Sequence, residues 1–481
     1  MPAGHPILRP GAVIDGFEIG PLLHKGGMAM LYEARRPGLS QPLILKTPRL
    51  GEGEDPAAIV SFEMEMMILP RLEGPHAPKV FGVGDFARDP YIVLERLPGP
   101  SLLAKLASLP LPVEEVARIG AAVADGLNAL HRQNVIHLDV KPSNILFRDS
   151  GEAVLIDYGL AHHAELPDLL AEEFRLPYGT APYIAPEQTL GQRGYRRSDL
   201  FALGVLLYFF ATGVRPFGDP EGLKGLRRRL WEDPVPPRAL RPELPDWLQE
   251  IILHCLEPDP EARLPTAAAL AFDLRHPEQT PRTARAAKLK RDGWLARSRR
   301  RRAAEAMAGR KRKQALASQI AATPILCAAV DLSAESAALA GAMHQTLQTA
   351  LAARPGARLA CLNVLKLKTV GLDATLDAEG RNRHVQRLVE LQHWAAPLRL
   401  PEARVSFHVL EAADPAAAIL GYAHANHVDH IVMGARAESL GRRLLGSVSA
   451  EVAAHAPCTV TVVRARALAG AAQAPRDEAA A

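Results

Sequence analysis

Short apolar runs separated by turns make up residues 10–100, with one stretch of helical spacing from about Ile59 to Leu72. Apolar residues then recur at helical spacing from Val113 to His131. Residues 190–275 look mainly helical, with Pro-rich turns such as 233–237. A period of two is typical of strands, whereas a period of 3.6 is typical of helices. The pattern predicts a small β-rich lobe followed by a larger helical lobe.

A different pattern begins after Thr323. Five short apolar runs alternate with four Ala-rich helical segments, the runs being Pro324–Asp331, Arg358–Val364, Val405–Leu410, His430–Gly434 and Thr459–Val463. Strands that alternate with helices imply an α/β domain with a parallel, doubly wound sheet. The final residues, from about Leu468, are rich in Ala, Pro and charged residues, and we expect them to be disordered.

Length and composition agree with more than one globular domain. The chain has 481 residues, of which 48% are hydrophobic and 23% are charged, enough for two or three domains with large cores. We place the domains at 10–275 and 323–465, with a linker at 276–322 and a tail at 466–481. The longest apolar run, Leu200–Val214, is shorter than the roughly 18–20 residues that cross a bilayer. We therefore expect it to form a buried core helix.

Cysteine usage and the N-terminus both bear on location. Four cysteines lie far apart without metal-ligand spacing, namely Cys255, Cys327, Cys361 and Cys458. This distribution indicates free thiols in a reducing compartment. The first ten residues lack the apolar stretch of a signal peptide, and neither end has a lipidation motif. These features predict a soluble, cytoplasmic protein with no transmembrane segment.

The linker is strongly basic, although the net charge of the whole chain is only +4. Fourteen Lys and Arg residues lie between Arg282 and Lys313 against only Asp292 and Glu305, so the rest of the chain is net acidic. Such a run could bind nucleic acid or an anionic membrane surface. Alternatively, it is a solvated connector that docks onto the acidic domains or keeps them apart. We favour the connector over nucleic acid, because Trp294 is the only aromatic residue and single-strand stacking needs several.

Candidate chemistry is concentrated between residues 137 and 159. The run His137-Leu138-Asp139-Val140-Lys141-Pro142-Ser143-Asn144 is followed by Ile145-Leu146, by a strand-like stretch at 153–156 and by Asp157-Tyr158-Gly159. These runs offer a candidate base, a phosphate-seeking lysine and two hard oxygen ligands suited to Mg²⁺. Phosphoryl transfer needs these parts, because its catalysis consists mainly of positioning and charge stabilisation.

These motifs resemble the catalytic and metal loops of the bacterial, eukaryotic-like Ser/Thr protein kinases. The resemblance implies a bilobal α+β protein-kinase fold in which Asp139 orients the substrate hydroxyl and accepts its proton. It also implies that Lys141 neutralises the γ-phosphate of ATP, and that Asn144 and Asp157 hold Mg²⁺. Thr180 would help to position Asp139 and would favour Ser/Thr over Tyr substrates.

Other positions of the family pattern lie upstream of these loops. Lys46 ends an expected strand and would pair with Glu65 on the following helix, so that the ammonium grips the α- and β-phosphates. Backbone groups around Glu95-Arg96-Leu97 would read the adenine edge, with Leu94 behind them. The resemblance places the nucleotide beside four further residues, namely Gly26, Gly27, Leu31 and Leu146.

Three downstream positions would carry a structural role. The stretch from Gly179 to Glu187 looks like the end of an activation segment. In the resemblance, Glu187 pairs with Arg263. Asp199 would start the central helix of the large lobe and hold the backbone of the catalytic loop.

The loop that covers the phosphates, residues 24–31, departs from the three-glycine pattern of the family. His24 and Ala29 stand where the first and third glycines would be, and Ile44 replaces a small alanine on the adenine face. Each lost glycine stiffens the loop and adds a Cβ near the nucleotide. We expect weaker or slower handling of ATP, although every essential charge is retained.

The activation segment departs from the family as well. Leu138 stands where many kinases place the arginine that binds a phosphorylated activation loop. Tyr178 is the only hydroxyl residue between Leu160 and Gly179, where the chain instead carries Glu165, Asp168, Glu172 and Glu173. Our hypothesis is that activation-loop phosphorylation does not switch this kinase on. Phosphosite mapping that finds Thr180 or Tyr178 modified in step with activity would refute it.

Residues 323–465 resemble the universal stress protein family, an α/β fold in which some members bind ATP. The resemblance depends on Asp331 at the end of the first strand, Gly434 at the end of the fourth, and Gly446-Ser447 at the start of the next helix. In ATP-binding members such glycines wrap the ribose and phosphates with backbone N–H groups. Here Ala437 replaces one glycine and the spacer is one residue short. Binding of ATP or AMP stays open beside a second interpretation, a dimerisation module whose last strand pairs with a second copy.

Taken together, the motifs predict an ATP- and Mg²⁺-dependent Ser/Thr protein kinase, acting on protein substrates in stress signalling, fused to a stress-protein module. The C-terminal domain would add a homodimer contact or a second nucleotide. The rival is a pseudokinase, a nucleotide-binding scaffold, which His24, Ala29 and Ile44 keep open. A small-molecule kinase on the same fold is disfavoured by the complete segment at 179–187.

Overall fold

The computed structural model describes residues 9–51, 55–174, 177–302, 304, 324–332, 337–367, 375–377, 380–435 and 446–464. Two compact units make up the chain. The first comprises Met1–Ala322 with Leu372–Val389, and the second comprises Thr323–Gly371 with Glu390–Ala481.

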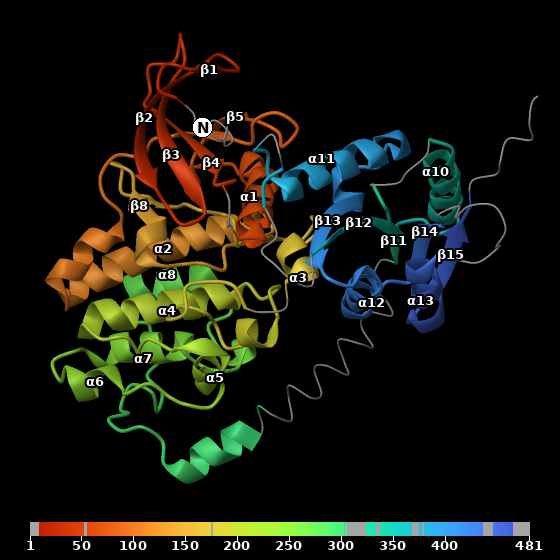
Figure 1. The fold of residues 1–481 in the computed structure, drawn as a ribbon. Helices are drawn as coiled ribbons and strands as arrows, with labels where there is room; N and C mark the ends of the chain where they lie inside the picture. Colours follow the sequence, from red (N-terminus) through yellow and green to blue (C-terminus); the bar gives the residue numbers. More distant parts are fainter. Residues whose placement is uncertain are drawn as a thin grey trace, which may run out of the picture. The chain divides into compact units, whose positions relative to one another are not determined.

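An antiparallel sheet of six strands opens the first unit, in the order β1-β2-β3-β4-β6-β5 (Figure 1). Its strands are β1 (Val13–Ile14), β2 (Phe17–Lys25), β3 (Ala29–Arg35), β4 (Leu43–Pro48), β5 (Val80–Val83) and β6 (Ile92–Glu95). Alternate residues such as Phe17, Leu45 and Val93 form the core on one face of this sheet. Helix α1 (Pro56–Ile68) interrupts the strands. Asp55 caps α1 by accepting a hydrogen bond from the N–H of Ala57.

Helices dominate the rest of the first unit, as the apolar spacing predicts. They are α2 (Val113–Arg132), α3 (Leu169–Glu173), α4 (Arg197–Thr212), α5 (Gly222–Arg227), α6 (Pro237–Leu240), α7 (Asp246–Cys255) and α8 (Ala267–Arg275). Helix α4 is buried along nearly its whole length and packs against α2 and α7, which confirms the predicted core helix. None of the described helices combines the length and the hydropathy that a bilayer crossing requires.

Two short antiparallel strand pairs carry the loops with candidate chemistry. β7 (Val135–Ile136) pairs with β10 (His162–His163), and β8 (Ile145–Phe147) pairs with β9 (Ala153–Leu155). The loop 137–144 therefore lies between β7 and β8, while the loop 156–161 lies between β9 and β10. Because β7 pairs with β10 and β8 pairs with β9, the two loops begin and end beside each other. The N–H of Ile156 accordingly donates to the carbonyl of Asn144 at 2.9 Å.

The described part of the basic linker packs against the helical lobe. The Arg285 guanidinium lies 3.0 Å from Oε1 of Glu250 and 2.8 Å from Oε1 of Glu257. Gln249 donates hydrogen bonds of 2.8 Å to the carbonyls of Arg285 and Lys288. These contacts favour the interpretation of this stretch as a docked connector.

The second unit is built on a parallel sheet of five strands in the order β13-β12-β11-β14-β15. Its elements are β11 (Ile325–Ala329), α10 (Ala337–Ala352), β12 (Arg358–Lys366), α11 (Arg383–Ala395), β13 (Val405–Ala412), α12 (Pro415–Ala425), β14 (His430–Gly434), α13 (Ser447–His455) and β15 (Thr459–Val463). The residues of α11 up to Val389 count with the first unit. The predicted alternation of five strands and four helices is confirmed.

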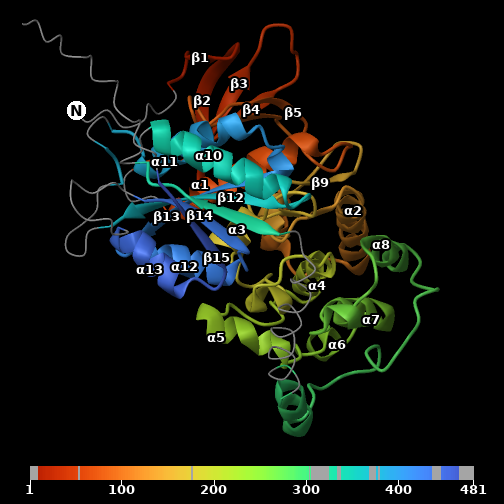
Figure 2. The ribbon, with the colours of Figure 1, turned by 90° about the vertical axis from the view of Figure 1, so that its right-hand side faces the viewer.

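Helices cover both faces of this sheet (Figure 2). Leu326 and Ala328 of β11 point to α10 and α11, where they join a core with Leu347 and Trp394. Cys327 of β11 points to the opposite face, which α12 and α13 cover. The near-continuous apolar strands follow from this burial on both sides.

Candidate active site

Lys46 on β4 is the centre of a charged triad. Its Nζ lies 2.6 Å from Oε2 of Glu65 on α1 and 3.1 Å from Oδ1 of Asp157, which follows β9. Lys46 and Glu65 retain only 14% and 3% of their side-chain exposure, whereas Asp157 retains 46%. The structure thus joins three residues that the sequence spreads over 111 positions.

The pKa values in this triad follow from burial and mutual attraction. Burial lowers the pKa of Lys46, but Asp157 and Glu65 outweigh burial and raise it. Attraction to Lys46 lowers the pKa of Asp157 against the effect of its own burial. Burial raises the pKa of Glu65, and Lys46 opposes that rise. Because the Lys46–Glu65 contact is only 2.6 Å, we take the pair as charged.

A second network surrounds Asp139. Its Oδ1 accepts hydrogen bonds from the N–H and the hydroxyl of Thr180, at 3.2 and 3.0 Å. Its Oδ2 lies 2.7 Å from Nζ of Lys141 and accepts a 3.0 Å hydrogen bond from Nδ2 of Asn144. Nζ of Lys141 also donates to the Thr180 hydroxyl at 2.8 Å. All four predicted residues of these loops therefore belong to one connected group.

The donor set at this point suits a divalent metal ion. Both hydrogens of the Asn144 amide are directed to Asp139, so the amide oxygen must point away from that residue. This oxygen accepts only the Ser143 hydroxyl within the described part of the chain. The Asp157 carboxylate uses Oδ1 for Lys46 and is half-exposed. An amide oxygen and a half-exposed carboxylate oxygen are hard ligands of the kind that Mg²⁺ prefers.

The tight turn from β2 to β3 carries the two predicted glycines of the phosphate loop. The Gly26 N–H donates to the Ala29 carbonyl at 2.9 Å. A Cβ at Gly26 would lie 3.2 Å from that carbonyl oxygen and 3.6 Å from Nε2 of His24, so there is little room for a side chain. Arg49, just after β4, donates a 3.2 Å hydrogen bond to the carbonyl of Gly26 and so stabilises the turn.

The predicted hinge begins at Glu95, the last residue of β6. The Glu95 carboxylate is held by Arg148 at 2.5 Å, a partner that the sequence did not reveal. The N–H of Leu97 makes no backbone hydrogen bond to another described residue. Leu31 lies opposite Lys46 in the β3–β4 pair, and Leu146 lies opposite Val154 in the β8–β9 pair.

Buried polar contacts support the catalytic loop. Asp199, in the first turn of α4, accepts hydrogen bonds from the N–H groups of His137 and Leu138, at 2.9 and 2.8 Å. Nε2 of His131 lies 2.8 Å from the same carboxylate, a contact that sequence reasoning missed. Glu187 and Arg263 form a bidentate pair at 2.7 Å, and both side chains are buried. The predicted roles of Asp199 and of the Glu187–Arg263 pair are thus confirmed as contacts.

The backbone of both loops is strained beside this network. Leu138 and Asp157 adopt left-handed backbone conformations, with φ of 61° and 69°, which residues other than glycine rarely adopt. Leu138 is also 4% exposed, so an apolar side chain fills the position where many kinases have an arginine.

Arg229 is a further buried cation that the sequence did not single out. It is 1% exposed and donates hydrogen bonds to the carbonyls of Ala181 and Ile184, next to Thr180. Burial lowers its pKa to about 10. It therefore remains charged at neutral pH and holds the end of the activation segment.

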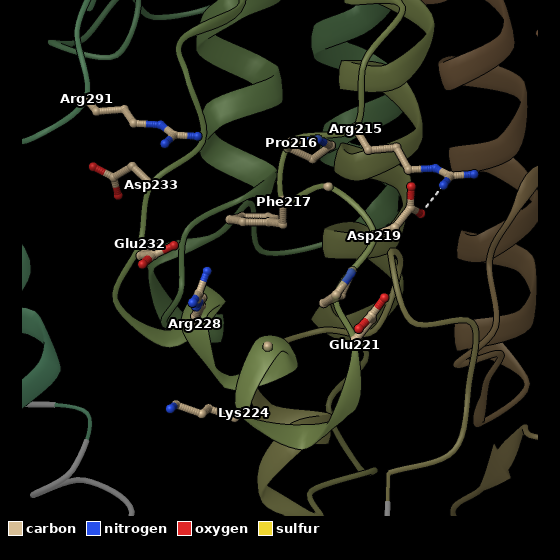
Figure 3. A pocket seen from close by; sticks show the side chains of 13 residues that line it. Arg215, Pro216, Phe217, Asp219, Glu221, Lys224, Arg228, Glu232, Asp233 and Arg291 are labelled. Atoms are coloured by element: carbon tan, nitrogen blue, oxygen red, sulfur yellow. Dashed lines mark hydrogen bonds and ion pairs between the residues drawn. The ribbon is translucent and has the colours of Figure 1, made fainter.

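A separate pocket of about 660 Å³ opens in the helical lobe (Figure 3). Phe217 lies in its middle, and the ion pair between Arg215 and Asp219 lies at its edge. None of the predicted site residues lines this pocket. The Arg229 guanidinium lies 5.4 Å from the centre of the Phe217 ring, so the pocket backs onto the residue that holds the activation segment.

The predicted nucleotide residues of the second unit lie at the carboxyl ends of its strands. Asp331 follows β11, Gly434 ends β14, and Gly446 and Ser447 open α13. A Cβ at Gly434 would lie 2.9 Å from Cδ2 of Leu339 on α10, so a larger residue there would displace this side chain. The predicted wrap at 436–445, including Ala437, lies outside the described residues.

Two family models match the chain. The model of the protein kinase domain matches residues 17–274, and the model of the universal stress protein family matches residues 323–464. The kinase part is similar to a probable serine/threonine-protein kinase of Streptomyces coelicolor, with 30% identity over 263 residues, or 54% of this chain and 39% of that protein. It is also similar to serine/threonine-protein kinase PknB of Mycobacterium tuberculosis, with 30% identity over 270 residues, or 55% of this chain and 43% of that protein. The chain therefore spans about two-fifths of the length of these curated relatives.

Proposed function

Because the chain belongs to the protein kinase family, whose members use ATP and a divalent metal ion, we propose that it phosphorylates Ser or Thr residues of proteins. The observation that carries this proposal is that the Lys46–Glu65–Asp157 triad and the Asp139–Lys141–Thr180 network lie on neighbouring loops. The loops meet where the N–H of Ile156, next to Asp157, donates a 2.9 Å hydrogen bond to the carbonyl of Asn144, which itself binds Asp139. Similarity to Ser/Thr kinases over the same residues supports the choice of substrate hydroxyl.

Each residue of the two networks has a task in this proposal. Lys46, oriented by Glu65, binds the α- and β-phosphates, and Lys141 binds the γ-phosphate as charge develops on it. Asp139 orients the substrate hydroxyl and takes its proton, while Thr180 fixes the carboxylate through two hydrogen bonds. Asn144 and Asp157 would hold Mg²⁺, which supplies charge neutralisation between the phosphates when bound.

The nucleotide would lie between the turn at Gly26-Gly27 and the strand β8. Leu31 and Leu146 would contact its adenine and ribose, and the backbone of Glu95 and Leu97 would bind the adenine edge. The N–H of Leu97, which has no backbone partner among the described residues, supports this placement.

The test is transfer of radiolabelled phosphate from ATP to a generic protein substrate by the full chain. We expect Asp139→Asn to lower the rate by about 10²–10⁴-fold, the usual contribution of a positioned general base. The control Asp149→Asn makes the same chemical change at an exposed turn and should leave the rate unchanged. Chelation of divalent ions should abolish transfer by the unmodified chain, and Mg²⁺ should restore it.

The pseudokinase alternative predicts a different result. A scaffold would bind ATP, detected by thermal stabilisation, yet the wild type and Asp139→Asn would give the same background of transfer. Equal rates for these two proteins would therefore reject the enzyme and retain only nucleotide binding.

For the second unit we propose a homodimer contact rather than a nucleotide site. Strand β15 lies at the edge of the sheet and pairs only with β14 among the described strands, so it can add a strand from a second copy. A Cβ at Gly434 would press on the side chain of Leu339, so close packing is a reason for glycine at this position that does not involve a nucleotide. Sedimentation of the full chain over a range of concentrations tests the dimer, and a monomer at every concentration would reject it. The full chain with Asp139→Asn and Lys46→Met, which impair the proposed kinase site, can then be titrated with ATP and AMP. Nucleotide binding that persists in this variant would indicate a second site.

The stress-signalling role and the cytoplasmic location remain predictions. All four cysteines are free thiols, in agreement with a reducing compartment. Burial raises the pKa of the Cys255 and Cys327 thiols to about 12, so these two are unreactive structural residues.

A further inference from the structure

The activation segment contains a buried carboxylate that does more than cap a helix. Oδ1 of Asp168 accepts a 3.2 Å hydrogen bond from the N–H of Ala171, which caps α3. Its other oxygen, Oδ2, accepts a 2.8 Å hydrogen bond from Nε of Arg193. A serine or asparagine would cap α3 equally well, so capping alone does not require a charge at this position.

Arg193 binds the segment at two places. Besides Asp168, it donates a 2.9 Å hydrogen bond to the carbonyl of Leu160, directly after Asp157-Tyr158-Gly159. Asp168 and Arg193 retain only 13% and 12% of their side-chain exposure. The Arg193 guanidinium therefore links the beginning of the activation segment to its middle, at a position largely shielded from solvent.

A third side chain, that of His162, lies next to the Asp168 carboxylate and favours its ionised form. Nδ1 of His162 lies 3.3 Å from Oδ2 of Asp168, the same oxygen that Arg193 binds. Burial would raise the pKa of Asp168, but Arg193 and His162 lower it to about 2. The carboxylate is therefore ionised at any physiological pH.

The helix that Asp168 caps connects this cluster to the catalytic triad. Leu169 and Leu170 are each 2% exposed, and α3 packs against α1. Helix α1 carries Glu65, whose contact with Lys46 defines the phosphate-binding arrangement. A Cβ at Gly159 would lie 2.2 Å from Oγ of Ser61, so α1 also rests directly on the start of the segment.

Phosphorylation normally orders such a segment by adding a negative charge that pairs with arginine. Here the arginine position of the catalytic loop is the buried Leu138, and Asp168 already supplies a negative charge to a different arginine. We propose that Asp168 and Arg193 are positioning residues that take the place of an activation-segment phosphate, holding α3 against α1 and so keeping the Lys46–Glu65 pair formed.

This inference rests on the proposed kinase activity, but it has a readout that does not depend on it. In the full chain, Asp168→Asn keeps the size of the side chain and the cap but removes the charge. We expect kcat to fall by at least about tenfold, since Glu65 would no longer be held beside Lys46, with the KM for ATP changed less than twofold. Hydrogen exchange of the α1 amides should become faster in the same variant.

Two further variants separate positioning from simple destabilisation. Arg193→Met should reproduce the loss of kcat, and the double variant should be no worse than either single one, because the two residues act as a unit. Arg193→Lys, which retains the charge, should recover part of the activity and serves if Asp168→Asn does not fold. The control Asp125→Asn removes an ion pair between α2 and α8 and should change neither kcat nor exchange in α1.

The outcomes are distinct. An inactive wild type would reject the proposed kinase function. The inference would then depend on hydrogen exchange of the α1 amides, which should still be faster in Asp168→Asn than in wild type. An active wild type whose activity is lost on phosphatase treatment would overturn the inference, as would Asp168→Asn with wild-type kcat and unchanged exchange in α1.

Discussion

Removal of Arg263 should destabilise the kinase unit more than the loss of any surface ion pair. Its guanidinium makes two hydrogen bonds of 2.7 Å to Glu187 and further ones to the carbonyls of Glu257 and Arg197, at 2.8 and 2.9 Å. Arg263→Met would leave the Glu187 carboxylate, 2% exposed, with only the Ser198 hydroxyl as a side-chain partner in the described part of the chain.

The magnitude follows from this burial. Breaking a buried pair by removing one partner costs about 3–5 kcal/mol, because an uncompensated charge stays in the interior. At about 2 °C per kcal/mol, the lower end of the range because the unit is large, the melting temperature of the kinase unit should fall by roughly 6–10 °C. Scanning calorimetry of the full chain measures this shift, with the transition of the second unit as an internal reference.

Two variants sharpen this test. The double variant Glu187→Gln with Arg263→Met should be less destabilised than the sum of its parts, since neither charge is then left alone. The control Arg275→Met breaks an exposed pair with Asp125 and should cost only about 0.2–1 kcal/mol. If Arg263→Met melts within about 2 °C of this control, the pair is not a buried support of the activation segment and the reasoning is wrong.

Three other perturbations have definite signs. Gly204→Ala places a Cβ 2.6 Å from Cβ of Cys255. Chemical denaturation should therefore show that the free energy of unfolding falls by about 1–3 kcal/mol, although alanine has a higher helix propensity than glycine. Asp168, whose pKa falls from 3.8 to about 2 on folding, contributes stability above pH 4 that is lost as the pH falls to 2. The difference in unfolding free energy between wild type and Asp168→Asn, roughly 2 kcal/mol at neutral pH, should therefore shrink over that range. Arg285→Ala removes both ion pairs to Glu250 and Glu257, so limited trypsin digestion should cut the basic linker faster than in wild type.

Much of the fold was predictable because burial leaves a periodic mark on the sequence. The strands of the second unit are buried on both faces and so read as continuous apolar runs, which is why all five were located. Helix α1 was placed three residues late and extended through the 3-10 turn at Leu69–Arg71, because end caps and turns have weaker signals than the apolar period.

The candidate site was readable for a chemical reason. Phosphoryl transfer needs particular groups at particular spacings, so Asp139, Lys141, Asn144 and Asp157 stand out from the local sequence alone. Their pairing with Lys46 and Thr180 was inferred through family resemblance, and the structure brings these side chains within hydrogen-bonding distance.

Only the tertiary structure decided which distant side chains meet. Asp168 and Arg193 are 25 residues apart, and Glu95 and Arg148 are 53 apart, and neither pair has a local pattern that marks it. Gly434 shows the converse, because a residue that looked like part of a nucleotide wrap also packs closely against the side chain of Leu339. Sequence by itself determined the two folds and the reactive groups, since periodicity and motif spacing are local properties. The contacts that hold those groups in place depend on which elements pack together, and packing is a property of the whole fold.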